Sequence, residues 1–131
     1  MIRRAFTMRL KSGAFNEYKR HHDNIWPDLV REIEASGIAQ ITTFRSGDSL
    51  FLYSEILDEA AWDRLWSSEV HRRWATVMEP LMFLKPDQTV DFGELTEIFH
   101  VETPAGKGAG QHGQTSPTLR GGPGAPLSPP A

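Results

Sequence analysis

The chain contains no cysteine, which excludes disulfide bonds, thiolate catalysis and cysteine-based metal sites. It also lacks an apolar run of the ~20 residues that a membrane-spanning helix requires. The Gly-x-Gly-x-x-Gly, P-loop, Gly-x-Ser-x-Gly and His-Glu-x-x-His patterns are absent as well. These absences exclude the usual routes to nucleotide, hydride-transfer and serine-hydrolase chemistry.

The chain also has only a small excess of acidic over basic residues, 17 against 14. The formal net charge of -3 at pH 7 gives no attraction towards nucleic acid or anionic lipid, so neither a nucleic-acid nor a membrane partner is predicted. The first residues, Ile2–Phe6, show no signal-peptide core, so a cytoplasmic location is predicted. His21 and His22 point about 100° apart on a helix, and no spacing resembles a zinc signature, so no metal site is predicted.

Composition changes abruptly after Glu102. Residues 103–131 hold seven of the eleven glycines and six of the nine prolines, with no acidic residue. Such a segment cannot bury enough apolar surface to offset the entropy of ordering it. The 131 residues therefore predict one folded domain over residues 1–102 and a disordered, Gly/Pro-rich tail over residues 103–131.

Apolar spacing within the domain predicts the element order β-α-β-β-α-β. A helix capped by Ser12 is expected to break before Pro27, because the proline ring removes a backbone donor, and to stop at Gly37. Asp58 is expected to cap the first of two later helices. The predicted strands are Ile2–Leu10, Ile38–Arg45, Leu50–Leu57 and Val90–Val101, and the later helices are Glu59–Ser67 and a second one starting at Glu69.

This order is the ferredoxin-like arrangement, an α+β fold with a four-stranded antiparallel sheet. Helices cover one face of such a sheet and leave the other uncovered. Alternation in the first strand places Phe6 and Ala5 on opposite faces, which makes both faces partly apolar. Because an exposed apolar face usually pairs with another copy, a homodimer is predicted.

Tyr18 and His22 carry the strongest chemical signal. Four residues apart on a helix, their side chains meet on one face. An imidazole with an unperturbed pKa of ~6.5 beside a phenol is suited to proton transfer near neutral pH. The alternative is a structural pair in the core, with each polar group satisfied by hydrogen bonds. Trp26 and Glu55 are further candidates for walls or partners in this site. The four tryptophans suggest either core packing or a sugar-binding platform.

Other polar groups have less specific interpretations. His71, Arg72 and Arg73 form a small basic patch, typical of a solvated helix face. Glu55 and Glu94 lie on predicted strands, where exposed carboxylates are common. Either one could orient a histidine or accept a hydrogen bond from a sugar hydroxyl. Glu97 is interpreted in the same way.

Several of these residues form a pattern that resembles the L-rhamnose mutarotase family. The resemblance covers residues 1–102 and none of the tail. It rests on Ile2-Arg3-Arg4-Ala5-Phe6, Tyr18-x-x-x-His22, Ile25-Trp26-Pro27, Glu55-Ile56, the Trp62 helix, Arg73-Trp74 and Glu94-Leu95-x-Glu97-x-Phe99.

The resemblance implies a dimeric α/β barrel of ferredoxin-like subunits. It implies an isomerase that interconverts the α and β anomers of a 6-deoxyhexose without a metal or organic cofactor. His22 occupies the position of the family's proton donor, Tyr18 that of a substrate-binding tyrosine, and Trp74 that of the first of two paired tryptophans. The second tryptophan is Ala75 here, and a substrate-binding tyrosine of the second strand is Ile41. These two departures leave open whether the sugar is L-rhamnose, L-fucose or a related sugar.

Mutarotation requires one proton given to the ring oxygen and one removed from the anomeric hydroxyl. His22 is the predicted donor. Tyr18, Glu55 or a water molecule is the candidate for the anomeric proton, and Trp26, Trp62 or Trp74 for the wall against the pyranose. Two other functions stay open for this topology: a cofactor-independent monooxygenase, and a non-catalytic small-molecule-binding module.

Overall fold

A four-stranded antiparallel sheet organises the computed structural model, which describes residues 1–105. The strand order in the sheet is β2-β3-β1-β4. The strands are β1 Ile2–Arg9, β2 Ile38–Ser46, β3 Ser49–Ile56 and β4 Gly93–Leu95. The helices are α1 Phe15–Asp23, α2 Pro27–Ala35, α3 Ala61–Ser67 and α4 Glu69–Met78, followed by a 3₁₀ turn at Glu79–Leu81. With its first helix split in two, this is the predicted ferredoxin-like fold.

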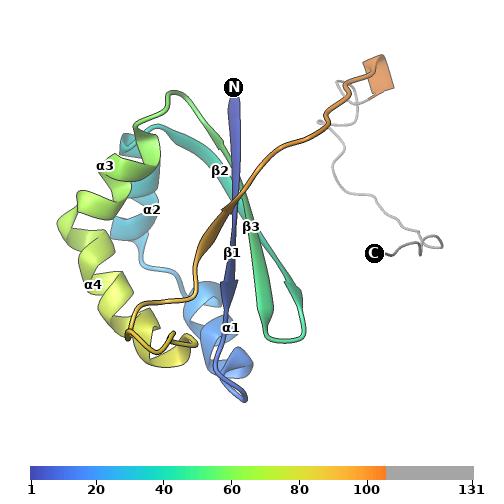
Figure 1. Cartoon of the computed structure of the whole chain (residues 1–131). Helices are drawn as coiled ribbons and strands as arrows, with labels where there is room; N and C mark the ends of the chain where they lie inside the picture. Colours follow the sequence, from blue (N-terminus) through green and yellow to red (C-terminus); the bar gives the residue numbers. More distant parts are fainter. Residues whose placement is uncertain (106–131) are drawn as a thin grey trace. The chain divides into compact units, whose positions relative to one another are not determined.

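The helices lie on one side of the sheet (Figure 1). Strand register puts Phe6 of β1 opposite Leu52 of β3, and the alternation of side chains sends both towards the helices. Phe6 is fully buried there against the rings of Trp62 and Trp66. The core therefore lies between the sheet and the helical layer, and the cavity described below opens in the same layer.

Local signals set most helix boundaries as predicted. Pro27 occupies the first turn of α2, where its missing N–H leaves no bond unmade, and α1 ends before it at Asp23. Gly37 follows α2 with φ +95°, a conformation that favours glycine.

The predictions that Ser12 caps α1 and that Asp58 caps α3 are both wrong. Gly13, at φ +83°, turns the chain so that Ala14 takes the N-cap position of α1 without a side-chain cap. The N-cap of α3 is Ala60, and Asp58 accepts a hydrogen bond from the Ala60 N–H ahead of the helix.

The last strand is much shorter than predicted. Only Gly93–Leu95 of the segment 90–101 pairs with β1. Val90 instead pairs with Leu84 in an isolated bridge, which takes the start of the segment away from the sheet. The paired stretch is long enough to complete the four-stranded sheet.

The described residues fall into two units, Met1–Glu97 and the residues from Ile98 onwards. Residues 106–131 lie outside the described part of the chain, so the disordered tail and its boundary at residue 102 stay predictions. Of the described helices, none combines the length and apolar character needed to cross a bilayer.

Candidate functional site

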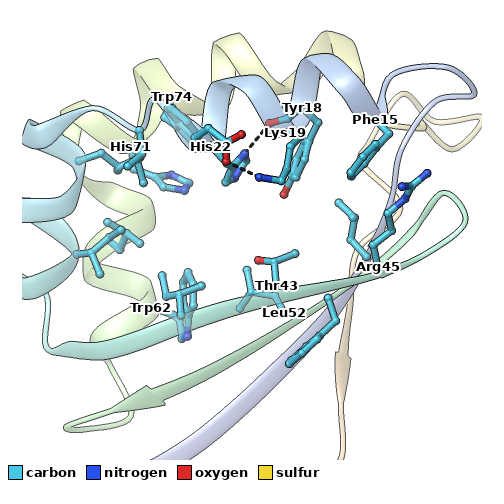
Figure 2. Close-up of a pocket in the computed structure, with 18 residues that line it drawn as sticks. Phe15, Tyr18, Lys19, His22, Thr43, Arg45, Leu52, Trp62, His71 and Trp74 are labelled. Atoms are coloured by element: carbon cyan, nitrogen blue, oxygen red, sulfur yellow. Dashed lines mark hydrogen bonds and ion pairs between the residues drawn. The ribbon is translucent and has the colours of Figure 1, made fainter. Parts of the chain in front are cut away.

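Two adjoining hollows, of about 500 and 440 Å³, open between the sheet and the helices. Volumes in this range are typical of small-molecule sites. We call their combined space the helix–sheet cavity; Figure 2 shows the larger of the two hollows. Six residues line both hollows, and they come from α1, β3, α3 and α4: Tyr18, His22, Leu52, Trp62, His71 and Trp74.

His22 is held in one tautomer by its own helix. Its Nδ1 lies 2.9 Å from the backbone carbonyl oxygen of Tyr18. A carbonyl only accepts, so Nδ1 carries the proton and donates it, and in the neutral ring Nε2 is a free acceptor. The ring stacks on the Tyr18 ring, with centroids 4.2 Å apart, and meets the edge of Trp74 at 5.1 Å. The predicted contact of the two side chains is thus a ring stack, while the imidazole's hydrogen bond goes to the backbone.

Burial sets the protonation of the groups in the cavity. It lowers the pKa of His22, an effect that the hydrogen bond to the Tyr18 carbonyl partly opposes. Burial likewise lowers the pKa of His71. It raises the pKa of the Tyr18 phenol to about 12. Near neutral pH the cavity therefore contains two uncharged imidazoles and a protonated phenol.

Of the three tryptophans predicted to bind the sugar, two line the cavity and the third packs behind one of them. Trp62 and Trp74 line both hollows. Trp62 is fixed by a hydrogen bond from its Nε1 to Ser54 Oγ, 2.9 Å away. Trp26 lies behind Trp74, edge to face at 5.1 Å, and lines neither hollow. Trp26 therefore positions Trp74.

The two positions at which the chain departs from the family pattern both border the cavity. Ile41 of β2 lines the larger hollow, and Ala75 of α4 lines the smaller one. Ile41 stands where the family resemblance implies a tyrosine, and Ala75 stands where it implies a tryptophan. Both are therefore placed to shape what the cavity accepts.

The strand carboxylates lie elsewhere. Glu55 accepts a hydrogen bond from the Tyr53 hydroxyl at 2.8 Å, and the strand alternation puts both on the sheet face opposite the helices. Glu55, a candidate for a wall or partner of this site and for accepting the anomeric proton, therefore lies outside the cavity. Glu94 makes a two-pronged ion pair with Arg4, and Glu97 makes one with Arg3.

Sequence reasoning missed His71, which it placed in a solvated basic patch with Arg72 and Arg73. The structure puts the His71 ring in the cavity instead. Its spacing of three residues from Trp74, which places both on one helix face, was the available signal. Lys19, Thr43 and Arg45 are further polar residues of the larger hollow.

Within residues 1–105, no three histidine or acidic side chains gather closely enough to hold a metal ion.

Fold and cavity together define a class: a small ferredoxin-like α+β protein whose helix–sheet cavity combines aromatic walls with two imidazoles. A family model described as L-rhamnose mutarotase matches residues 3–101. An L-rhamnose mutarotase of Clostridium beijerinckii is 35% identical over 78% of this chain and 100% of its own length. One of Tolumonas auensis is 36% identical over 77% of this chain and 99% of its own length.

This chain belongs to the L-rhamnose mutarotase family. The predicted family and enzyme class, an isomerase of the aldose mutarotase type, are confirmed. The solved L-rhamnose mutarotase of Formosa agariphila has the same fold, with a TM-score of 0.66, 27% identity, and coverage of 78% of this chain and all of that one. An antibiotic biosynthesis monooxygenase is also similar, with a TM-score of 0.54, but at 13% identity the likeness shows the fold alone. It covers 75% of this chain and 99% of its own length.

Proposed function

We propose that this protein interconverts the α and β anomers of L-rhamnose or a related 6-deoxyhexose by general acid–base catalysis, with His22 as the proton donor. The observation that carries the proposal is the arrangement of His22: Nδ1 is fixed on the Tyr18 carbonyl, so in the protonated ring Nε2 is the nitrogen that can donate a proton into a cavity walled by Trp62 and Trp74. Family membership supports the same reaction.

The chemistry requires little more than this. The ring oxygen gains a proton, the C1–O5 bond breaks, and the anomeric hydroxyl loses its proton to leave an aldehyde. Rotation about C1–C2 and closure then give the other anomer. A well-placed acid or base contributes roughly 10²–10⁴ in rate. The indoles of Trp62 and Trp74 offer apolar faces to the C–H face of the pyranose, and the Tyr18 phenol, which stays protonated, is available to bind a hydroxyl.

The sugar is proposed as a class rather than as one compound. Ile41 brings no hydrogen-bonding group to the larger hollow, and Ala75 leaves space in the smaller one. Matched polar contacts often dominate discrimination between similar substrates, so these two positions favour testing several deoxy sugars.

We also propose a homodimer, because aromatic side chains are exposed on the sheet face away from the helices. A cytoplasmic location stays a prediction from the sequence.

Saturation transfer between anomeric protons, measured by NMR on L-rhamnose, L-fucose and related sugars, tests the proposal. Wild-type protein is expected to accelerate exchange of at least one sugar, and His22→Gln is expected to lose on the order of 10²-fold or more of that rate. His21→Gln is the matched control, because His21 is the neighbouring histidine and lines neither hollow. Exchange at the wild-type rate in His22→Gln would remove His22 from the reaction, and no exchange of any sugar would overturn the proposed function.

A further inference from the structure

His71 is a second imidazole in the site. It lies in the first turn of α4, where its backbone N–H bonds to Ser68 Oγ at 3.2 Å, and its half-buried side chain lines both hollows. Figure 2 shows its ring entering the cavity from α4, while the ring of His22 enters from α1. Residues that are far apart in sequence thus bring two imidazoles to one cavity.

No group within residues 1–105 hydrogen-bonds to the His71 ring. The Tyr18 hydroxyl and the Trp74 indole N–H, which line the same cavity, likewise have no hydrogen bond within residues 1–105, whereas Trp62 is paired with Ser54 and His22 with the Tyr18 carbonyl. A polar ring placed in a cavity without a partner calls for an explanation, because such groups are normally satisfied. A ligand in the cavity is the natural partner.

The proposed reaction also needs a group that accepts the proton of the anomeric hydroxyl. Since Nδ1 of His22 is committed to the Tyr18 carbonyl, His22 has one nitrogen left for the sugar. A single nitrogen cannot protonate the ring oxygen and accept the anomeric proton in the same step. A second acceptor is required, either a side chain of the cavity or a water molecule.

The other titratable groups of the cavity are poorly suited to that task. Tyr18 is protonated and would have to ionise first. Lys19 and Asp23 form an ion pair with each other. Arg45 lies over the Phe15 ring, 3.5 Å from its centroid, and carries no acceptor. Glu79, in the smaller hollow, is an exposed side chain that water solvates.

We propose that His71 is the second proton-transfer residue of the site: it accepts the anomeric hydroxyl proton while His22 donates to the ring oxygen. This inference rests on the proposed function. In the catalytically active form of the enzyme, one of the two imidazoles is protonated and the other is neutral.

Protons and charge balance across the sugar. Protonated His22 gives its Nε2 proton to O5 as the C1–O5 bond breaks, and neutral His71 takes the proton from O1 as the C1=O1 bond forms. His22 ends neutral and His71 ends protonated. Closure to the other anomer returns a proton from His71 to O1 and from O5 to His22, so no other reactant is needed.

The pH profile of kcat separates this role from a structural one. With both imidazoles protonated, His71 cannot accept; with both neutral, His22 cannot donate. Wild-type kcat is therefore expected to be bell-shaped in pH, with its maximum on the acid side of neutrality because burial lowers both pKa values. Tyr18, Lys19, Asp23, Arg45 and Glu79 also face the cavity, and the His71 variant keeps all of them.

The test compares His71→Gln with wild type and with His21→Gln, using the sugar that wild type exchanges fastest. Glutamine keeps hydrogen-bonding atoms but cannot carry a proton between them. We expect kcat to fall on the order of 10²-fold, KM to change much less, and the decline of kcat at low pH to disappear, while His21→Gln keeps the kcat and KM of wild type and a bell-shaped pH profile. Circular dichroism and the thermal midpoint establish that the variant is folded.

Each other outcome has a definite meaning. An unchanged kcat with an unchanged pH profile overturns the role of His71, and so does a rise in KM alone. In both cases the proposed function stands, because wild type still exchanges the sugar. No exchange by wild type contradicts the proposed function first, and the role of His71 with it.

Discussion

Burial gives individual side chains of this cavity their charge state. His22 lies against the rings of Tyr18 and Trp74, His71 lines the same cavity, and burial lowers the pKa of each histidine below its ordinary value. Tyr18, stacked on His22, has its pKa raised to about 12. Burial thus keeps the two imidazoles in their neutral form and the Tyr18 phenol protonated. Neutral imidazoles and a neutral phenol suit an uncharged sugar, while two of the charged side chains of the lining, Lys19 and Asp23, pair with each other.

The lowered histidine pKa values predict how stability depends on pH. In the unfolded chain both imidazoles titrate near ~6.5, whereas the folded protein resists their protonation. Below ~6.5 the unfolded state therefore binds more protons, and stability is lost as the pH falls through the folded pKa values. Thermal midpoints measured between about pH 7.5 and about pH 5 should fall less in a His22→Gln/His71→Gln double variant than in wild type.

His21→Gln serves as the control for that series, since His21 lies outside the cavity and should follow wild type. Equal declines in wild type and the double variant would show that neither imidazole contributes to acid sensitivity.

Residues of the site were predictable to the extent that they share one helix. Tyr18 and His22 are four apart, and this spacing alone placed them together. His71 was missed because, apart from Trp74 on its own helix, the residues that share both hollows with it belong to α1, β3 and α3, so its place in the cavity depends on how α4 packs against these elements. Glu55 was misplaced for the opposite reason: strand alternation sends it away from the helices, and the register that decides this is a property of the whole sheet.

Individual elements are tied to one another by a buried hydroxyl. Ser54 of β3 is fully buried; its Oγ donates to the Arg4 carbonyl at 2.7 Å and accepts from Trp62 Nε1 at 2.9 Å. One side chain thus joins β3, β1 and α3. Because Trp62 is also a cavity wall, the same contact holds the site in shape.

Ser54→Ala is expected to destabilise the fold by about 1–3 kcal/mol, because it leaves a buried indole N–H without an acceptor. Urea denaturation measures the change. Ser46→Ala, at the exposed end of β2, is the matched control and should stay within about 0.5 kcal/mol of wild type. Equal stability of the two variants would contradict a structural role for the Ser54 hydroxyl.

Element boundaries follow local chemistry where a residue's own backbone decides them. Pro27 and Gly37 act through their φ angles, so the start and stop of α2 were predictable. The length of β4 was not, because apolar alternation does not reveal that Val90 pairs with Leu84 before the chain reaches β1. Competition between pairing partners is a tertiary effect that no window of sequence contains.

On the scale of the whole molecule, the sheet has one face that no described helix covers (Figure 1). Phe44 of β2 and Phe51 of β3 are directly paired on it and are 61% and 38% exposed. Leu95 of β4 is 44% exposed and shares that face through its pairing with Ala5. We call this surface the outer sheet face. Adjacent exposed aromatic rings on a flat sheet are typical of a surface that pairs with another protein.

A second copy of the chain is the occupant that we propose for the outer sheet face. Light scattering after size exclusion should give wild type a mass of about twice 14.8 kDa. Phe51→Lys places a charge in the centre of the interface and should shift the protein towards the monomer. Val30→Lys, at an exposed apolar position of α2, is the matched control and should remain dimeric. A monomeric wild type would refute the dimer, and a dimeric, folded Phe51→Lys would place its interface on another surface.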